Sequence, residues 1–162
     1  AALGDSRRAW ELLAMINPMN HGSSPEEIAI YKGEPYVVAA DVYAVPPHVG
    51  RGGWTWYTGS ASGMYRAGLE SILGIERRGA FLSTKSCSPA AWPGFSAVLR
   101  FGSARYEIEV ENPERRCCGV AIVELDGMAV DPLAIPLRDD GRTHSVRAVI
   151  GVESPDTLYE RS

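Results

Sequence analysis

The sequence predicts an α+β fold in which helices come first and strands follow. Apolar residues recur at helical spacing in the first half of the chain, whereas apolar and polar residues alternate over 104–111 in the second half. Gly74 is placed to end the last predicted helix, and Gly102 is placed to turn between two predicted strands. Because helices and strands are segregated along the chain, we expect a boundary near 75–80.

Length and composition limit the class of protein. The 162 residues, 45% hydrophobic and 22% charged, fit one globular domain or a domain with an appendage. A net charge of −4 gives no electrostatic footprint for nucleic acid, so we expect no such partner. No apolar run is long enough to span a bilayer and no signal peptide begins the sequence. The three cysteines lack metal-ligand spacing, so no bound metal is expected, and their odd number favours reduced thiols and a cytoplasmic setting.

Two helices are predicted before residue 33. Asp5 or Ser6 can cap a helix that continues to about Ile16. Its buried face would consist of Ala9, Leu12, Leu13 and Ile16. The run 24–27, Ser-Pro-Glu-Glu, is a capping box with proline in the first helical position, and it predicts a short helix to about Tyr31. The sequence begins inside an element and without Met, so we expect a piece of a longer protein.

Two further helices are predicted before the strands. Pro35 and the alanines at 39 and 40 favour a helix over 36–43. The prolines at 46 and 47 then enforce an extended loop. The last helix is expected over about 60–73. Its buried face would consist of Ala61, Met64, Tyr65, Gly68, Leu69 and Ile72.

The second half of the chain reads as strands. The predicted strands are 95–101, 104–111, 119–125 and 144–150. Gly102-Ser103 and Asp126-Gly127 are hairpin turn signals. In 104–111 one face would be buried and the other solvated, since the apolar residues alternate with Arg and Glu. The tail from Glu153 is polar, and we expect it to be frayed.

The residues 58–60, Thr-Gly-Ser, lie where the last predicted helix begins. Backbone N–H groups at a helix N-terminus lack partners and the helix dipole favours an anion, so a phosphate or sugar oxygen would suit this position. A structural alternative stays open, in which Thr58 or Ser60 only caps the helix.

Aromatic residues next to this helix start point to a sugar. Amphipathic rings beside a glycine-rich loop are typical of a sugar-binding cleft. The candidate cleft residues are Glu34, Tyr36, Arg51, Trp54, Trp56 and Tyr57. Glu34 could instead pair near a helix start, and Arg51 could be a solvated loop residue. The three histidines fall on separate loops or strand ends, so no catalytic residue and no metal ligand is assigned among them.

Five short motifs occur in a fixed order along the chain. They are Ile16-Asn17-Pro18, Glu34-Pro35-Tyr36, Trp54-Thr55-Trp56-Tyr57-Thr58-Gly59-Ser60-Ala61, Ile72-Leu73-Gly74-Ile75 and Trp92-Pro93-Gly94-Phe95. In this order they resemble the C-terminal end of the inverting disaccharide and oligosaccharide phosphorylases, the cellobiose and chitobiose phosphorylase family (glycoside hydrolase family 94). Within that family, the run 46–54 is similar to the C-terminal region of the cyclic β-1,2-glucan synthases. The resemblance extends to about Gly151.

The resemblance implies an architecture. Residues 1–78 would be the terminal helices of an (α/α)6 barrel catalytic domain, and 79–152 would be a small antiparallel β-sandwich followed by a polar tail at 153–162. Thr58 and Gly59 match the family's Thr-Gly pair that contacts inorganic phosphate, which is a co-substrate rather than a cofactor. The family's general acid, an Asp, lies upstream of this chain, as do its phosphate-binding His and Arg, so no catalytic residue is expected here. Ala40 stands where cellobiose phosphorylase-like members have a sugar-contacting Gln, which favours a different glucan linkage.

Two functional hypotheses follow from the resemblance. In the first, the chain is a C-terminal fragment of a phosphorylase-like domain acting on β-1,2-glucan; it contributes part of the phosphate and sugar site and is inactive alone. In the second, it is a non-catalytic carbohydrate-binding or structural module that supports a glucan synthase. The expected partners are a β-glucan oligosaccharide, phosphate, the rest of the parent chain, and a second copy bound through exposed barrel helices. A parent attached to the bacterial inner membrane is an alternative to a wholly cytoplasmic one.

Overall fold

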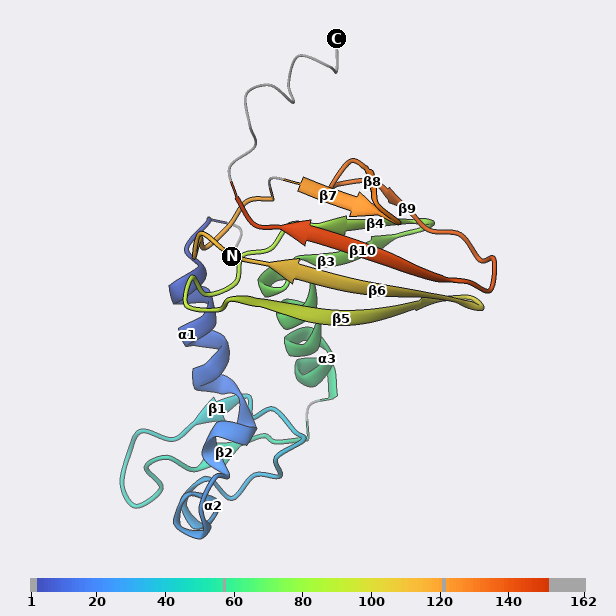
Figure 1. Cartoon of the computed structure of the whole chain (residues 1–162). Helices are drawn as coiled ribbons and strands as arrows, with labels where there is room; N and C mark the ends of the chain where they lie inside the picture. The colour runs from blue at the N-terminus through green and yellow to red at the C-terminus, as the bar shows by residue number, and fades with distance from the viewer. Residues whose placement is uncertain (1–2, 57, 121, 152–162) are drawn as a thin grey trace. The chain divides into compact units, whose positions relative to one another are not determined.

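The computed structural model describes residues 3–56, 58–120 and 122–151 (Figure 1). Residues 9–68 form one compact unit, here called the loop unit, and the other described residues form a second, the sheet unit. Three α-helices precede most of the strands, so the predicted mixed α+β class is confirmed. Among the described residues, no helix combines the length and apolar character that a membrane span requires.

The first two predicted helices are confirmed. Helix α1 spans Ser6–Ile16, and the Asp5 carboxylate accepts the backbone N–H of Arg8 at 3.0 Å. After the 3-10 helix η1, Pro18–His21, helix α2 spans Pro25–Tyr31. The Ser24 hydroxyl caps α2 by accepting the backbone N–H of Glu27 at 3.2 Å, as the capping box predicts.

The predicted buried face of α1 is wrong in part. Leu12 and Ile16 are about half exposed, at 48% and 49%. Tyr65, expected on the buried face of the last helix, is 71% exposed. Helical spacing identifies an apolar face, but a neighbouring element must cover that face before it becomes buried.

The predicted helix over 36–43 is also wrong. A turn closes between Glu34 and Val37, and the chain then enters strand β1, Asp41–Val42. This strand pairs antiparallel with β2, Gly52–Gly53. The backbone N–H groups of Ala40 and Tyr43 donate to Gly53 and Arg51 at 3.0 and 2.9 Å, so the groups a helix would pair internally are used across the hairpin.

The last predicted helix is present, with an earlier start and an irregular end. Helix α3 spans Thr58–Arg66 and continues as the π-helical segment η2, Ala67–Ile72. Gly74 ends it with a left-handed φ of 72°. A Cβ at Gly74 would collide with the backbone of Lys85, so this stop requires glycine.

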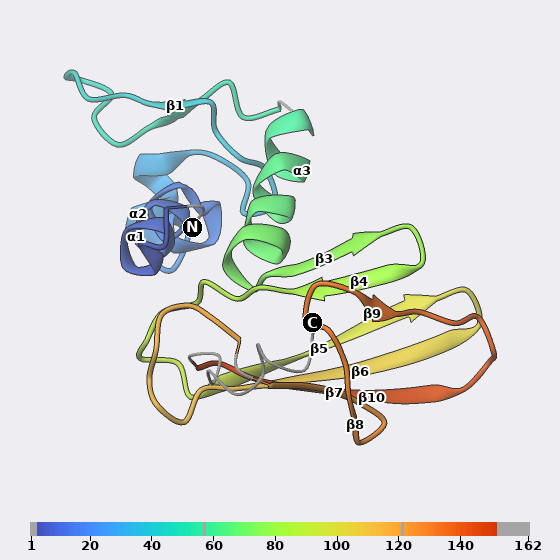
Figure 2. The ribbon, with the colours of Figure 1, turned by 90° about the horizontal axis from the view of Figure 1, so that it is seen from above.

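The sheet unit contains two layers of strands, which Figure 2 shows from above. One sheet has the order β3-β4-β9, with bounds Ile75–Arg78, Phe81–Thr84 and Ile135–Pro136. The other has the order β5-β6-β10-β7-β8, with bounds Gly94–Phe101, Ala104–Glu111, Thr143–Val149, Ile122–Leu125 and Met128–Ala129. The hairpins β5–β6 and β7–β8 confirm both turn signals, and Asp126 and Gly127 have the positive φ values, 52° and 80°, of a type I′ turn.

The expectation of a wholly antiparallel sandwich is wrong at one pair of strands. Strand β10 pairs parallel with β6 over seven residues, from Thr143 opposite Arg105 to Val149 opposite Glu111, and antiparallel with β7 on its other side. The sequence alternation that predicts each strand carries no information on which neighbour it joins or in which direction. The hairpin β3–β4 was not predicted.

The core of the sheet unit lies between the two layers. Tyr106, Ile108 and Val110 are buried while the residues between them are exposed, which confirms the predicted two faces of 104–111. Both sheets contribute to one cluster of buried apolar side chains. The cluster consists of Ile75, Leu82, Ala104, Tyr106, Ile108, Val110, Val123, Ile135, Leu137, Val146, Ala148 and Ile150.

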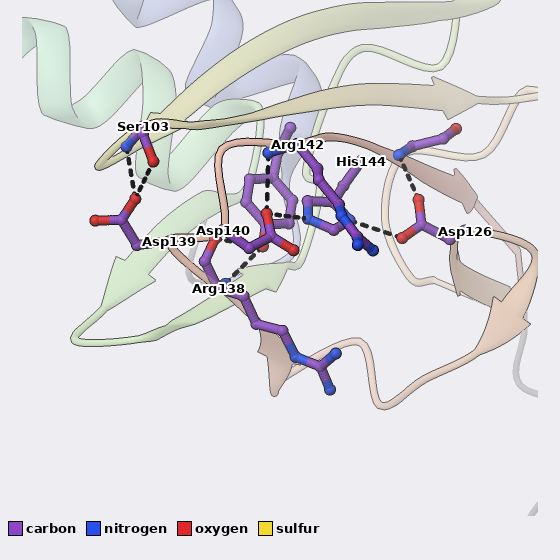
Figure 3. A network of polar contacts seen from close by, with 9 residues as sticks. Ser103, Asp126, Arg138, Asp139, Asp140, Arg142 and His144 are labelled. Atoms are coloured by element: carbon purple, nitrogen blue, oxygen red, sulfur yellow. Dashed lines mark hydrogen bonds and ion pairs between the residues drawn. The ribbon is translucent and has the colours of Figure 1, made fainter.

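A polar network lies at one end of the five-stranded sheet (Figure 3). His144 of β10, 8% exposed, stacks on Tyr106 with the ring centroids 4.7 Å apart. Its Nδ1 lies 2.7 Å from a carboxylate oxygen of Asp126, and its Nε2 lies 3.1 Å from one of Asp140. The hydrogen bond to Asp126 raises the pKa of His144 and lowers the pKa of Asp126, while a backbone N–H from Arg142 lowers that of Asp140.

Candidate functional site

The candidate site lies in the loop unit and is built around one buried ring. Tyr31, the last residue of α2, is 3% exposed and stacks on His21 with the ring centroids 4.6 Å apart. Burial raises the pKa of its phenol, while a hydrogen bond with the backbone of Ala39 acts in the opposite direction. The ring therefore joins α2 and η1 to the segment that leads into β1.

The second part of this scaffold is the buried backbone of β2. A Cβ at Gly52 would lie 3.1 Å from the Tyr31 ring and 3.3 Å from the Cβ of Ala39. The glycine thus lets β2 pass directly against Tyr31. Two buried glycines and one buried tyrosine fix the course of the chain immediately before Trp54.

The aromatic side chains after β2 face solvent. Trp54, which has a left-handed φ of 51°, and Trp56 are each 66% exposed, and Tyr36 is 70% exposed. The rings of Tyr36 and Trp56 meet edge to face, with centroids 6.3 Å apart and an angle of 70° between their planes. The structure thus brings together two of the predicted cleft residues, which are twenty positions apart in the sequence.

The predicted anion position is the start of α3. Thr58 and Gly59 are the first two residues of this helix, so their N–H groups belong to those that a helix leaves without internal acceptors. Gly59 is exposed, and apart from its chain neighbours and the backbone of its own helix, nothing lies within 4 Å of the place where its Cβ would be. The Thr58 side chain and all of Tyr57 lie outside the described residues.

The remaining predicted cleft residues have separate positions. Glu34 is half-buried, and its carbonyl accepts the backbone N–H of Val37 at 3.2 Å in the turn before β1. Arg51 is exposed and immediately precedes β2, where its N–H donates to the carbonyl of His48 at 3.1 Å. Their roles in a cleft stay predictions, as do those of Tyr36, Trp54 and Trp56.

Sequence patterns gave no site role to Asp41 and Tyr43, which lie at the β1–β2 hairpin. Asp41 places its carboxylate directly against Gly53, and the rings of Tyr43 and His48 lie 6.1 Å apart in the loop between β1 and β2. The predicted helix over 36–43 concealed Asp41 and Tyr43. A two-residue strand has no periodicity, so only the glycine pair at 52–53 hinted at a close approach.

This arrangement suits binding more than bond breaking. It offers backbone donors at a helix start, exposed rings that can stack on an apolar sugar face, and a carboxylate at Asp41. Among the described residues, no group of three or more His, Cys, Asp or Glu side chains could hold a metal ion.

The chain matches one protein family and is similar to several known proteins. The family described as "Glycosyl hydrolase 94 superfamily, catalytic domain" matches residues 1–74. Cyclic beta-(1,2)-glucan synthase NdvB of Rhizobium meliloti (strain 1021) is 45% identical over 115 residues, which are 71% of this chain and 4% of that protein.

Phosphorylases of disaccharides are also similar to it. N,N'-diacetylchitobiose phosphorylase of Vibrio proteolyticus is 31% identical over 150 residues, which are 92% of this chain and 18% of that enzyme. 3-O-beta-D-glucopyranosyl-beta-D-glucuronide phosphorylase of Paenibacillus borealis is 30% identical over 146 residues, or 88% of this chain and 18% of that enzyme. The chain thus spans less than a fifth of the length of these relatives.

Proposed function

Because the chain belongs to the glycosyl hydrolase 94 superfamily, we propose that it is part of an inverting glycoside phosphorylase-like domain and contributes to its phosphate and sugar site. The observation that carries this proposal is the start of α3, where Thr58 and Gly59 present backbone N–H groups next to exposed aromatic residues. The helices of residues 1–78 are proposed to be the end of an (α/α)6 barrel. The parent is proposed to be cytoplasmic or attached to the bacterial inner membrane.

The chemistry of phosphorolysis explains how little the local site has to supply. An inverting hydrolase needs an acid and a base carboxylate flanking a water molecule. In a phosphorylase the bound phosphate is itself the nucleophile and replaces both the base and the water. Thr58 and Gly59 would therefore only have to hold the anion in line with the anomeric carbon, while an acid outside this chain protonates the leaving sugar.

A β-glucan is the proposed sugar substrate, with β-1,2-glucan first among the linkages. The synthase that shares 45% identity is named for a cyclic beta-(1,2)-glucan, and Ala40 lacks the amide that we associate with cellobiose-specific relatives. The edge-to-face pair Tyr36 and Trp56 supports a sugar-contacting role, since exposed amphipathic rings lose water favourably against a sugar face.

The decisive experiment changes one hydroxyl in the intact parent protein. Thr58→Val keeps the β-branched shape and removes the side-chain donor. A hydrogen bond to a charged group contributes roughly 1.5–3 kcal/mol, so the KM for phosphate should rise on the order of tenfold to a hundredfold. The matched control is Thr55→Val, the same change three residues before α3, which should leave that KM unchanged.

The alternative roles give different results in the same experiment. If Thr58 only caps α3, the variant loses about 1 kcal/mol of stability and keeps its phosphate kinetics. If the parent is a binding or structural module, it retains glucan binding but releases no sugar phosphate. We expect the 162-residue chain alone to be inactive, because the proposed general acid lies outside it.

A further inference from the structure

All three cysteines of the chain gather beside one cavity of the sheet unit. The cavity has a volume of about 480 Å³ and lies against the β3–β4 hairpin, the η2 segment and the connection that contains Cys118. Cys87 and Cys118 line it. Cys117 lies next to them, because its Sγ is 3.2 Å from the Sγ of Cys118. Residues that are 31 positions apart in sequence, 118 − 87 = 31, thus share one site.

The contacts of Cys118 place it between the other two thiols. Its thiol lies within hydrogen-bonding reach of both Cys117 and Cys87, and it donates to the carbonyl of Gly4 at 3.4 Å. Burial and the two neighbouring thiols raise the pKa of Cys118 to about 12. Cys87 is 5% exposed, whereas Cys118 is half-buried, so a reagent in the cavity reaches Cys118 first.

Backbone geometry decides which pair of thiols can bond. Consecutive Cα atoms are about 3.8 Å apart across a trans peptide, whereas a relaxed disulfide needs about 4.4–6.8 Å between its Cα atoms. A bond between the adjacent Cys117 and Cys118 would therefore be strained. Cys87 comes from a different segment, and its backbone is held by a hydrogen bond to the carbonyl of Ile72 at 3.0 Å. Cys87, which comes from a separate segment and lies within hydrogen-bonding reach of the Cys118 thiol, is therefore the candidate partner for Cys118.

The charges around the cavity suit a small zwitterionic reagent. Lys85 and Arg78 supply cations, while Glu70 and Glu76 supply carboxylates. Arg78 and Glu76 form a bidentate ion pair with each other, with N–O distances of 2.9 and 3.1 Å. Lys85 is a further cation in the lining of the cavity. Both signs of charge therefore border the thiols, as an amino-acid or peptide disulfide would require.

We propose that Cys87 and Cys118 form a reversible disulfide by exchange with a low-molecular-weight peptide disulfide that enters this cavity. In the first step the Cys118 thiol gives up its proton, and the thiolate attacks one sulfur of the reagent, giving a mixed disulfide and one released thiol. Because the pKa of Cys118 is raised, this step should become faster as the pH rises. In the second step the Cys87 sulfur attacks Cys118 and releases the second thiol. The two protein protons end on the two released thiols, so two protein thiols are oxidised and one reagent disulfide is reduced.

Peptide mapping of the full chain tests this proposal, with oxidised glutathione as the probe. After incubation of the folded chain and alkylation of the remaining thiols, trypsin releases Cys87 in the peptide 86–100 and both other cysteines in 117–138. We expect these two peptides to be joined before reduction and separate after it. One of the three thiols should remain free. The melting temperature should rise by roughly 5–15 °C on oxidation, as expected for a closed loop of this length.

Two Cys→Ser variants identify which pair of cysteines forms the bond. The peptide map of the wild-type chain tests the proposal even if a variant does not fold. Cys117→Ser should keep the joined peptides, and Cys118→Ser should lose them. A peptide 117–138 that is lighter by two hydrogens would overturn the proposal, because it shows a bridge between the adjacent cysteines. A glutathione adduct that persists without joined peptides, or three thiols that stay free, would overturn it as well.

Discussion

The loop unit and the sheet unit are held together in different ways. Among the described residues of the loop unit, the buried large apolar side chains are Tyr31 and Val37, whereas both sheets of the sheet unit share a continuous apolar cluster. Close backbone packing at Gly52 replaces side-chain burial in the loop unit. Tyr36 and Trp56 of the loop unit are therefore expected to contribute little to its stability, whereas Tyr106 of the sheet unit is part of the core.

The largest expected effect separates two tyrosines, one from each unit. Tyr106 is fully buried, accepts the backbone N–H of Arg138 at 2.6 Å and stacks on His144, so Tyr106→Ala should cost about 3–5 kcal/mol of unfolding free energy. Tyr36→Ala, at a 70% exposed position, should change it by less than about 0.5 kcal/mol. Urea denaturation measures both. Equal losses would remove the contrast between the units.

An intermediate effect is expected from glycine in the loop unit. Gly52→Ala would press a methyl group against the Tyr31 ring and Ala39, at a cost of about 1–3 kcal/mol. Gly63→Ala is the matched control, since it lies within α3 with no atom within 4 Å of the added Cβ, and it should stabilise by about 0.5–1 kcal/mol. Thermal unfolding measures the stability of both variants. An unchanged melting temperature for Gly52→Ala would contradict the close packing of β2 against Tyr31.

The smallest expected effect concerns pH and the sheet unit. The raised pKa of His144 means that its ion pairs contribute fully below its ordinary value of 6.5 and are lost as the pH rises through the raised value. The lowered pKa values of Asp126 and Asp140 mean that the carboxylates contribute above about 3.8 and are lost as the pH falls through the lowered values. The network is therefore strongest between roughly pH 4 and 6.5.

His144→Gln tests this window by removing the charge and keeping a polar side chain. Because both carboxylates are partly exposed, the loss of unfolding free energy at pH 6 should be smaller than that caused by Gly52→Ala. The wild-type chain should lose stability as the pH rises above 6.5, and the variant should not. Denaturation at several pH values gives both slopes, and parallel curves would show that His144 is not the titrating group.

Long regular patterns could be predicted from sequence, and short or non-local features could not. The strands 95–101 and 104–111 were predicted because eight-residue alternation fixes both the strand and its buried face. The alanines in 36–43 favour a helix, but hydrogen bonds to residues 51 and 53, which lie further along the chain, decide the conformation of this stretch. Propensity is overridden where a few long-range backbone contacts are available.

The candidate site likewise has features that sequence patterns predict and features that depend on contacts between distant segments. The start of α3 at Thr58 agrees with the helix N-terminus expected at residues 58–60. The contact of Tyr36 with Trp56 and the approach of Asp41 to Gly53 depend on the β1–β2 hairpin, which two-residue strands do not reveal in sequence. What contacts the phosphate and the sugar stays a prediction.

The parallel pairing of β10 with β6 has a consequence for the order in which the sheet can assemble. β10 is the last described strand, yet it lies in the centre of its sheet, between β6 and β7. Thr143 pairs with Arg105 across a separation of 38 residues, 143 − 105, so this contact carries a high loop-closure cost and is expected to form late and slowly. Until β10 pairs, β6 and β7 each present an open edge. During synthesis the sheet therefore stays incomplete at its centre until residues 143–149 have left the ribosome.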